Sequence, residues 1–266
     1  GCSGKKTSEP AGSDAGSAKA SSKKAVELQV FAANSLEKAL PEVQELYTDQ
    51  TGTTFADTQF KASGDLVEQM KAGATVDVLI TASKGTMDDA ETAELVDTDT
   101  REDMFVNDLV IIRAEGSDTK VEAIADVANL DGKIAIGDAK TVPAGKYANQ
   151  ALASVGLYTG TEGDDGEYAP ELADKVALAD KVGTAASYVS TGDCVAGFVY
   201  SSDIFRYDGI EEAFVCPEDS HKPIVYPGAV ADSSEHADEA KAFIDFCLTN
   251  KKAQKIWAKY GFELSE

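Results

Sequence analysis

Histidine and cysteine are scarce in this sequence of 266 residues, which holds two histidines and four cysteines. His221 and His236 stand in no recognisable metal or triad spacing, and a histidine in a loop is more often exposed than catalytic. The sequence also lacks a glycine-rich phosphate loop, a nucleophile elbow and a paired-cysteine zinc site. These absences argue against an enzyme, a bound cofactor and a site for a metal cation.

Acidic residues outnumber basic residues in this sequence. Lysine and arginine number 24 against 47 aspartates and glutamates, which gives a formal net charge of −23. Such a charge repels nucleic acid and anionic membrane surfaces, so neither is an expected electrostatic partner. Any anion that binds must therefore be held by groups close to it.

Long apolar runs are missing too. The longest, such as 109–112 and 195–200, are far shorter than the ~20 residues of a membrane-spanning helix. Hydrophobic residues nevertheless make up 43% of the chain. That is enough for a sizeable core, in one large domain or two of ordinary size.

The first 24 residues differ in composition from the rest. Cys2 is followed by a stretch rich in Ser, Ala, Gly and Lys without apolar periodicity, which predicts a disordered tether over 1–24. A cysteine ahead of such a tether resembles the mature start of a bacterial lipoprotein, where it carries lipid. The alternative for Cys2 is a stray surface thiol. Of the other cysteines, Cys194 and Cys216 could form a disulfide in an oxidising compartment, although spacing does not determine the pairing, and Cys247 fits a small core residue of an amphipathic helix.

Strand and helix patterns alternate after the tether. Runs typical of strands at 26–31, 53–60 and 76–81 are separated by helical patterns at 36–49 and 65–71. The alternation predicts an α/β fold, and the nearly continuous apolar run 76–81 is typical of a strand covered on both faces. Pro41 falls early in the first helix, where we expect a kink or an irregular first turn.

Several strand ends carry groups that could hold an anion. Ser35 and Ser63 follow strands and are placed as helix N-caps, where free N–H groups and a positive dipole end favour negative charge. Ala144 follows Pro143 at a third such junction, and Tyr200 ends a buried strand with a donor hydroxyl. The alternatives are plain capping serines, an ordinary helix start and a tyrosine packed at the sheet edge. The acidic segment 160–168 lacks the ligand order of a calcium loop and is predicted to be a solvated loop.

Six sequence blocks carry a family resemblance. They are FAANSL at 31–36, FKASG at 60–64, ATVDVLI at 74–80, GDAKTVPAGKYA at 137–148, GFVYSSD at 197–203 and YGF at 260–262. Together, and in this order, they resemble the periplasmic or extracellular molybdate-binding proteins of ABC importers, over a span from about residue 26 to residue 262. One block alone would be weak, whereas six in the right order are specific.

The resemblance implies a fold. It is the two-lobed, type II periplasmic-binding-protein fold, α/β in class, with a mixed and mostly parallel sheet flanked by helices in each lobe and the ligand in the cleft between them. Lobe 1 would comprise 25–106 and 225–266, and lobe 2 would comprise 107–224. The lobes would close by a hinge motion at crossing strands near 106–107 and 224–225.

The resemblance also implies an oxyanion site. Ser35 and Ser63 would supply hydroxyl and backbone N–H groups, Ala144 and Val182 backbone N–H groups, and Tyr200 its phenol hydroxyl. Three features depart from the family's usual pattern: Asn34 in place of a small residue, the pair 61–62 before Ser63, and the long segment 160–168. Neutral donors on helix termini suit a tetrahedral dianion that needs no protonation.

The expected protein is a monomeric receptor on the extracellular face of the membrane or in the periplasm, anchored by lipid on Cys2. It would capture molybdate and tungstate with high affinity and pass them to a membrane permease and its ATPase. Three alternatives remain open at this point: a receptor for another oxyanion (tungstate alone, sulfate or phosphate), a secreted hydrolase with Ser35 or Ser63 as nucleophile, and a surface adhesion domain.

Overall fold

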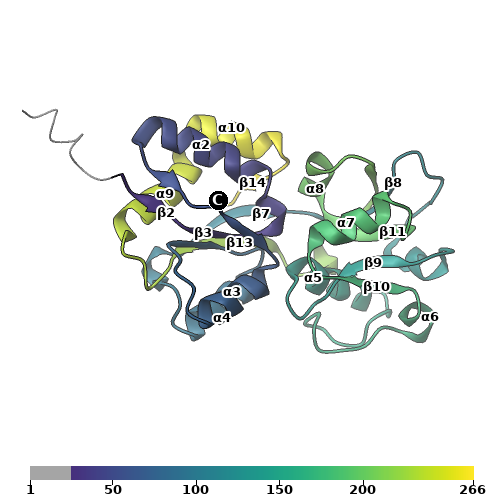
Figure 1. Ribbon diagram of the computed structural model, residues 1–266. Coiled ribbons are helices and arrows are strands. Elements are labelled where there is room, and N and C mark those ends of the chain that lie inside the picture. Colours follow the sequence, from purple (N-terminus) through teal and green to yellow (C-terminus); the bar gives the residue numbers. More distant parts are fainter. Residues whose placement is uncertain (1–24) are drawn as a thin grey trace, which may run out of the picture.

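The computed structural model describes residues 25–266, so the predicted tether and Cys2 lie outside the described residues. The chain forms two α/β lobes, each a sheet with helices packed on it (Figure 1). Lobe 1 holds a six-stranded sheet and lobe 2 a five-stranded sheet. Within the described range, no helix is both long enough and apolar enough to cross a membrane.

The sheet of lobe 1 has the strand order β14-β7-β13-β6-β3-β5. Its neighbours β5, β3 and β6 run parallel, whereas β13, β7 and β14 join antiparallel. The strands are β3 (Val30–Ala33), β5 (Gln59–Lys61), β6 (Val78–Ile80), β7 (Glu102–Asn107), β13 (Ile224–Val230) and β14 (Glu263–Leu264). Two short strands, β2 (Glu27–Leu28) and β4 (Thr54–Phe55), pair separately.

Helices cover both faces of this sheet. One face carries α2 (Ala39–Thr51), α9 (Ala237–Thr249) and α10 (Lys251–Lys259), and the other carries α3 (Ser63–Lys71) and α4 (Lys84–Thr92) (Figure 1). Under α10, the rings of Trp257 and Phe105 pack at a tilt, with centroids 4.5 Å apart. Under α3 and α4, Phe31, Leu79 and Met87 belong to a second buried cluster. Full burial of each such side chain is worth about 1.5–3 kcal/mol.

The sheet of lobe 2 has the order β10-β9-β11-β8-β12, parallel from β10 to β11 and antiparallel beyond. Its strands are β8 (Leu109–Ala114), β9 (Ile134–Gly137), β10 (Val176–Ala179), β11 (Ala196–Tyr200) and β12 (Ile210–Val215). The helices are α5 (Pro143–Ala153), α6 (Pro170–Ala173), α7 (Val182–Ser190) and α8 (Ser201–Arg206). Short 3₁₀ turns complete the chain: η2 (Asn34–Leu36), η3 (Thr98–Thr100), η4 (Ile124–Asn129) and η5 (Glu218–Ser220).

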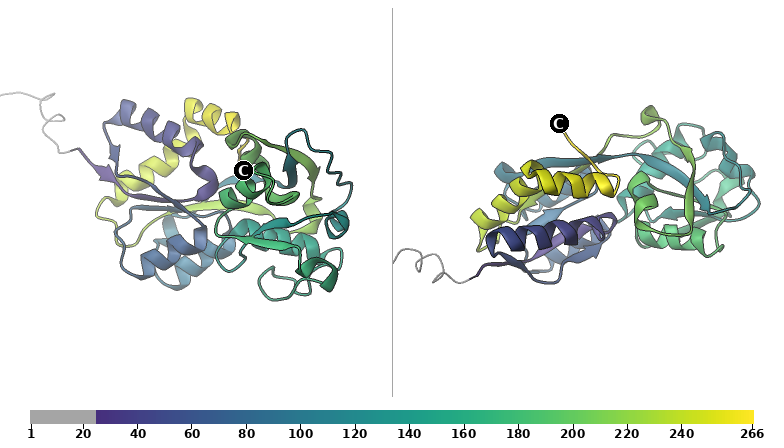
Figure 2. Two further views of the ribbon diagram at one scale, coloured as in Figure 1. Left: turned by 45° about the vertical axis from the view of Figure 1, so that its right-hand side comes forward. Right: turned by 90° about the horizontal axis from the view of Figure 1, so that it is seen from above.

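Two segments join the lobes, as the turned view and the view from above show (Figure 2). The chain leaves β7 in lobe 1 and enters β8 in lobe 2 with only Asp108 between them. It returns between β12 and β13. Because Val106 pairs with Val225 and Asn107 with Ile224, the outgoing and returning segments are neighbouring antiparallel strands. The division into lobes at 106/107 and 224/225 remains a prediction.

The predicted α/β class with two mixed sheets is confirmed, but the expectation of mostly parallel sheets is wrong. Parallel pairing is confined to one part of each sheet, where strands alternate with helices. The strands that carry the chain between the lobes run against their neighbours, which makes the remainder antiparallel.

Pro41 explains how the first helix begins. The expected helix from 36 starts only at Ala39, after the 3₁₀ turn η2, so Pro41 lies in the first turn of α2. A proline there removes an N–H that has no partner in the helix. The predicted irregular first turn is confirmed.

The disulfide considered between Cys194 and Cys216 is not formed, and both are free, buried thiols. The N–H of Cys216 bonds to the carbonyl of Leu109, whereas Cys194 precedes β11, in which Gly197 pairs with Ile112. Leu109 and Ile112 lie roughly 10 Å apart along β8, and a disulfide requires Cα atoms within about 7 Å. Cys247 is fully buried on α9, as predicted.

Candidate functional site

The five residues of the predicted oxyanion site line one pocket between the lobes. Ser35 and Ser63 come from lobe 1, and Ala144, Val182 and Tyr200 from lobe 2. All five are at least 95% buried. The space open to the centre of a water-sized sphere is about 10 Å³, about what one water molecule needs.

First-turn N–H groups form much of this pocket. Ser63 is the first residue of α3, Ala144 the second of α5 and Val182 the first of α7, and Ser35 lies in η2. An N–H in the first turn of a helix has no acceptor in its own helix. Three α-helices of 9 to 11 residues therefore begin at the same small space and direct their positive ends to it.

Close backbone packing sets the position of α5. A Cβ atom on Gly145 would lie 1.9 Å from the carbonyl oxygen of Gly137, so the start of α5 rests directly on the end of β9. This contact holds Ala144 at the pocket wall. No side chain larger than hydrogen fits at position 145.

Three hydroxyl groups face the pocket, and each is in a different state. The Ser63 Oγ accepts a hydrogen bond of 2.9 Å from the N–H of Ala82. The Ser35 Oγ lies 2.7 Å from the hydroxyl of Tyr226. The Tyr200 hydroxyl is buried and, within residues 25–266, is the one buried side-chain polar atom without a partner. Burial raises the pKa of Tyr200 well above its ordinary value, so the phenol keeps its proton and remains a donor.

The predicted capping role of the two serines is wrong. Ala33 and Ala62 occupy the N-cap positions of η2 and α3, and neither Ser35 nor Ser63 makes a side-chain cap bond. Each serine lies one or two positions further into its helix. The hydroxyls are therefore not used for capping and can serve the pocket.

Contacts between the lobes surround the pocket. The Asn34 Oδ1 accepts from the N–H of Gly183 at 3.0 Å and from Arg206 Nη2 at 3.1 Å. Arg206 Nη1 lies 2.6 Å from Glu37 Oε1, and on its own helix Arg206 Nε lies 3.0 Å from Asp203 Oδ1. These contacts join lobe 1 to α7 and α8, so the structure is the closed arrangement of the lobes.

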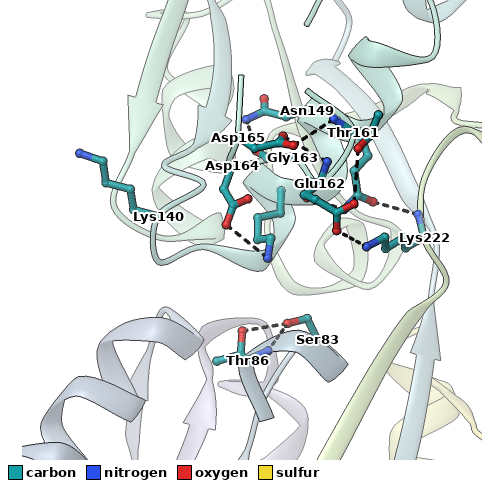
Figure 3. A network of polar contacts seen from close by, with 12 residues as sticks. Ser83, Thr86, Lys140, Asn149, Thr161, Glu162, Gly163, Asp164, Asp165 and Lys222 are labelled. Carbon is teal, nitrogen blue, oxygen red and sulfur yellow. Dashed lines mark hydrogen bonds and ion pairs between the residues drawn. The ribbon is translucent and has the colours of Figure 1, made fainter. Parts of the chain in front are cut away.

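The acidic segment 160–168 is mostly exposed, as predicted, and is also hydrogen-bonded to α5. Asn149 Nδ2 donates to the carbonyl of Gly163 at 2.8 Å, and Gln150 Nε2 donates to that of Glu162 at 2.9 Å. Glu162 also pairs with Lys222 at 2.5 Å. The segment therefore lies against α5, across a gap from Ser83 and Thr86 of lobe 1 (Figure 3). Within the described residues, no three histidine, cysteine, aspartate or glutamate side chains are grouped to hold a metal ion.

A larger cavity of about 480 Å³ lies beside the crossing strands. Its lining includes Asp108, Glu218, Asp219 and Glu263. Carboxylates make this cavity unfavourable for an anion, whatever its size. The small pocket of neutral donors is the better candidate site.

Sequence reasoning missed three residues close to the pocket: Asn107, Arg206 and Tyr226. Arg206 is placed three residues after Asp203 on α8, a spacing typical of a helical ion pair. Tyr226 and Asn107 lie on crossing strands, and only the pairing of β7 with β13 brings them together. In the described contacts neither Ser35 nor Ser63 has a histidine partner, so the hydrolase alternative gains no support.

Comparison with known proteins identifies the family. The family model for bacterial extracellular solute-binding proteins matches residues 28–263. The chain is 33% identical over 242 residues to the molybdate-binding protein ModA of Escherichia coli K12, and the match covers 89% of each protein. It is 30% identical over 257 residues to Bacillus subtilis YvgL, assigned as an ABC transporter substrate-binding lipoprotein. The match covers 95% of this chain and 92% of YvgL.

Solved structures agree on the fold. The periplasmic molybdate-binding protein of Azotobacter vinelandii matches with a TM-score of 0.75 at 21% identity, over 90% of this chain and 100% of that one. The predicted type II periplasmic-binding-protein fold is thereby confirmed. The chain belongs to the family of bacterial extracellular solute-binding proteins, whose members work in the periplasm or outside the cell.

Proposed function

We propose that this protein captures molybdate, and the similar dianion tungstate, with high affinity in the pocket between its lobes for import by an ABC transporter. The observation that carries the proposal is the convergence of neutral donors from both lobes on one small pocket. The similarity to the molybdate-binding protein ModA supports molybdate among the tetrahedral oxyanions.

Each of the five residues has a role in this proposal. Ser35 and Ser63 donate through hydroxyl and N–H groups, Ala144 and Val182 through N–H groups, and Tyr200 through its phenol. The phenol of Tyr200, which has no partner among residues 25–266, supports the assignment, because a buried hydroxyl without a partner costs free energy that a bound anion would recover. Neutral donors bind a dianion without forming an ion pair, which keeps release possible.

Size separates molybdate from sulfate in this proposal. The donors are fixed by helix starts and backbone packing, so they cannot follow a smaller anion inward. Each donor left unpaired costs about 1–3 kcal/mol. The net charge of −23 does not prevent binding, because charges beyond about 10 Å are screened at moderate salt.

The cellular setting belongs to the same proposal. Cys2 would carry the lipid anchor, which the similarity to a lipoprotein of Bacillus subtilis supports. The monomer would deliver its anion to a permease and an ATPase, and the crossing strands β7 and β13 would be the hinge. Labelling of cells with a fatty-acid analogue tests the anchor, since a Cys2→Ser variant would take up no label.

Isothermal titration with molybdate, tungstate, sulfate and phosphate tests the function. We expect tight binding of the first two and weak binding of the others. Ser63→Ala should weaken molybdate binding, whereas Ser154→Ala, which removes a hydroxyl that bonds to the Ala151 carbonyl on α5, should not. Strong binding of sulfate with no response to molybdate would contradict the proposal.

A further inference from the structure

Asn107 lies where the chain passes from lobe 1 to lobe 2, and its amide orientation is determined by its neighbours. Its Oδ1 lies 3.0 Å from the N–H of Asp108 and 3.4 Å from the N–H of Ser202. A backbone N–H can only donate, so the amide oxygen must occupy this side. The amide nitrogen is thereby placed on the other side.

The Asn107 nitrogen then fixes the hydroxyl of Tyr226. Nδ2 donates to Ser202 Oγ at 2.9 Å and to the Tyr226 hydroxyl at 3.3 Å. An amide nitrogen accepts no hydrogen bond, so the Tyr226 oxygen is the acceptor and its own hydrogen must go elsewhere. Tyr226 is fully buried, which raises its pKa and keeps it protonated. Its other polar contact is Ser35 Oγ, at 2.7 Å.

The direction of this chain of bonds decides what Ser35 offers to the pocket. Because Ser35 Oγ accepts from Tyr226, its own hydrogen is free to point at a ligand. Ser63 reaches the same state by a different route, since its oxygen accepts from the backbone N–H of Ala82. For Ser35 this state depends on two side chains, Asn107 and Tyr226, so a substitution can reverse the direction of the hydrogen bond.

We infer that Asn107 and Tyr226 are positioning residues that set the Ser35 hydroxyl as a hydrogen-bond donor to the bound oxyanion. The inference rests on the proposed function and deepens it. The relay, defined as Asn107, Tyr226 and Ser35, also depends on lobe 2, because the amide of Asn107 bonds to Ser202 at the start of α8. Whether the Ser35 hydroxyl of lobe 1 donates or accepts is thus determined by residues at the junction of the lobes.

Asn107→Asp tests the direction of the relay with almost no change of shape. The second carboxylate oxygen would accept where Nδ2 donates, so Tyr226 would turn its hydrogen away from Ser35. Ser35 would then donate to Tyr226 and present a lone pair to the anion. We expect molybdate affinity to fall by about 30-fold or more, from the loss of a charge-assisted donor and the repulsion that replaces it.

Tyr226→Phe separates the relay from the added negative charge. Alone, it leaves the Ser35 hydroxyl unoriented, and we expect about fivefold weaker binding. In this background, Asn107→Asp retains only its long-range charge effect, so the two substitutions should be strongly non-additive in a double-mutant cycle. Tyr168→Phe is the matched control, because it removes another phenol bonded to an amide, that of Asn149, away from the pocket.

The measurements are titration calorimetry with the four anions, thermal unfolding of each variant, and a neutron structure of the unliganded protein. Neutron density should place the Tyr226 deuterium toward Ser35 and the Ser35 deuterium away from Tyr226. The reverse placement overturns the relay even if no anion binds, and so does an additive cycle or Tyr226→Phe with wild-type affinity. If the wild type prefers sulfate, the proposed function fails while the same cycle, measured with sulfate, still tests the relay. Should Asn107→Asp not fold, Tyr226→Phe against its control decides.

Discussion

Asn34 offers a sharp test of how contacts between the lobes contribute to affinity. Its Oδ1 accepts one neutral hydrogen bond from Gly183 and one from the charged Arg206, and both donors belong to lobe 2. These bonds exist only when the lobes are closed around the pocket. Asn34→Ala should therefore destabilise the closed state and leave the folding of each lobe nearly unchanged.

The size of the effect follows from the two bonds. A neutral hydrogen bond contributes about 0.5–1.5 kcal/mol and one to a charged group about 1.5–3 kcal/mol. Arg206 keeps Asp203 and Glu37 as partners, so we take the lower end, about 2 kcal/mol in total. Only the closed state encloses the ligand, so this cost should weaken molybdate binding about 30-fold.

Two measurements on Asn34→Ala check this reasoning. Titration calorimetry gives the affinity, and small-angle scattering without ligand should show a more extended average shape than the wild type. Asn129→Ala, an exposed change on lobe 2, should alter neither quantity. Unchanged or tighter binding by Asn34→Ala would refute the argument, because it would mean that the freed Gly183 N–H serves the anion better than it serves Asn34.

Further predictions concern the pocket and the thiols. Tyr200→Phe removes the unpartnered buried hydroxyl, so it should raise the melting temperature of the empty protein while weakening molybdate binding about tenfold; a lower melting temperature would count against this. Gly64→Ala places a Cβ 2.8 Å from the Cα of Thr141 in lobe 2, so scattering should show incomplete closure and calorimetry a weaker affinity. Burial raises the pKa of Cys216 to about 12, so at pH 8 roughly one thiol in ten thousand is ionised, and a thiol reagent should modify Cys216 only after unfolding.

The order of strands and helices was predictable because their patterns are local. Apolar periodicity and helix-stop signals indicated the parallel part of each sheet. The antiparallel part was not predictable in this way, because β13 pairs with β7 although more than a hundred residues of lobe 2 separate them in the sequence. Pairing between strands so far apart in the sequence produces no local sequence pattern in either strand.

The sequence indicated which residues would meet at one pocket but not how they are hydrogen-bonded, and their role in binding an anion remains a prediction. The family resemblance indicated Ser35 and Tyr200, and the structure places both at one pocket. Ser35 depends on its contact with Tyr226, and the Tyr200 phenol has no partner among residues 25–266; both are properties of the packed neighbours. The capping role assigned to Ser35 failed because Pro41 delays the start of α2, a shift of three residues that propensity alone does not fix.

The use of main-chain N–H groups at Ala144 and Val182 bears on how the pocket can evolve. Every residue except proline supplies the same N–H, so point mutations at these two codons leave the donor in place and change only the bulk beside it. Selection can therefore adjust the volume of the pocket at 144 and 182 in small steps without losing its chemistry. The serine and tyrosine codons have less freedom, because most substitutions there remove the side-chain hydroxyl donor.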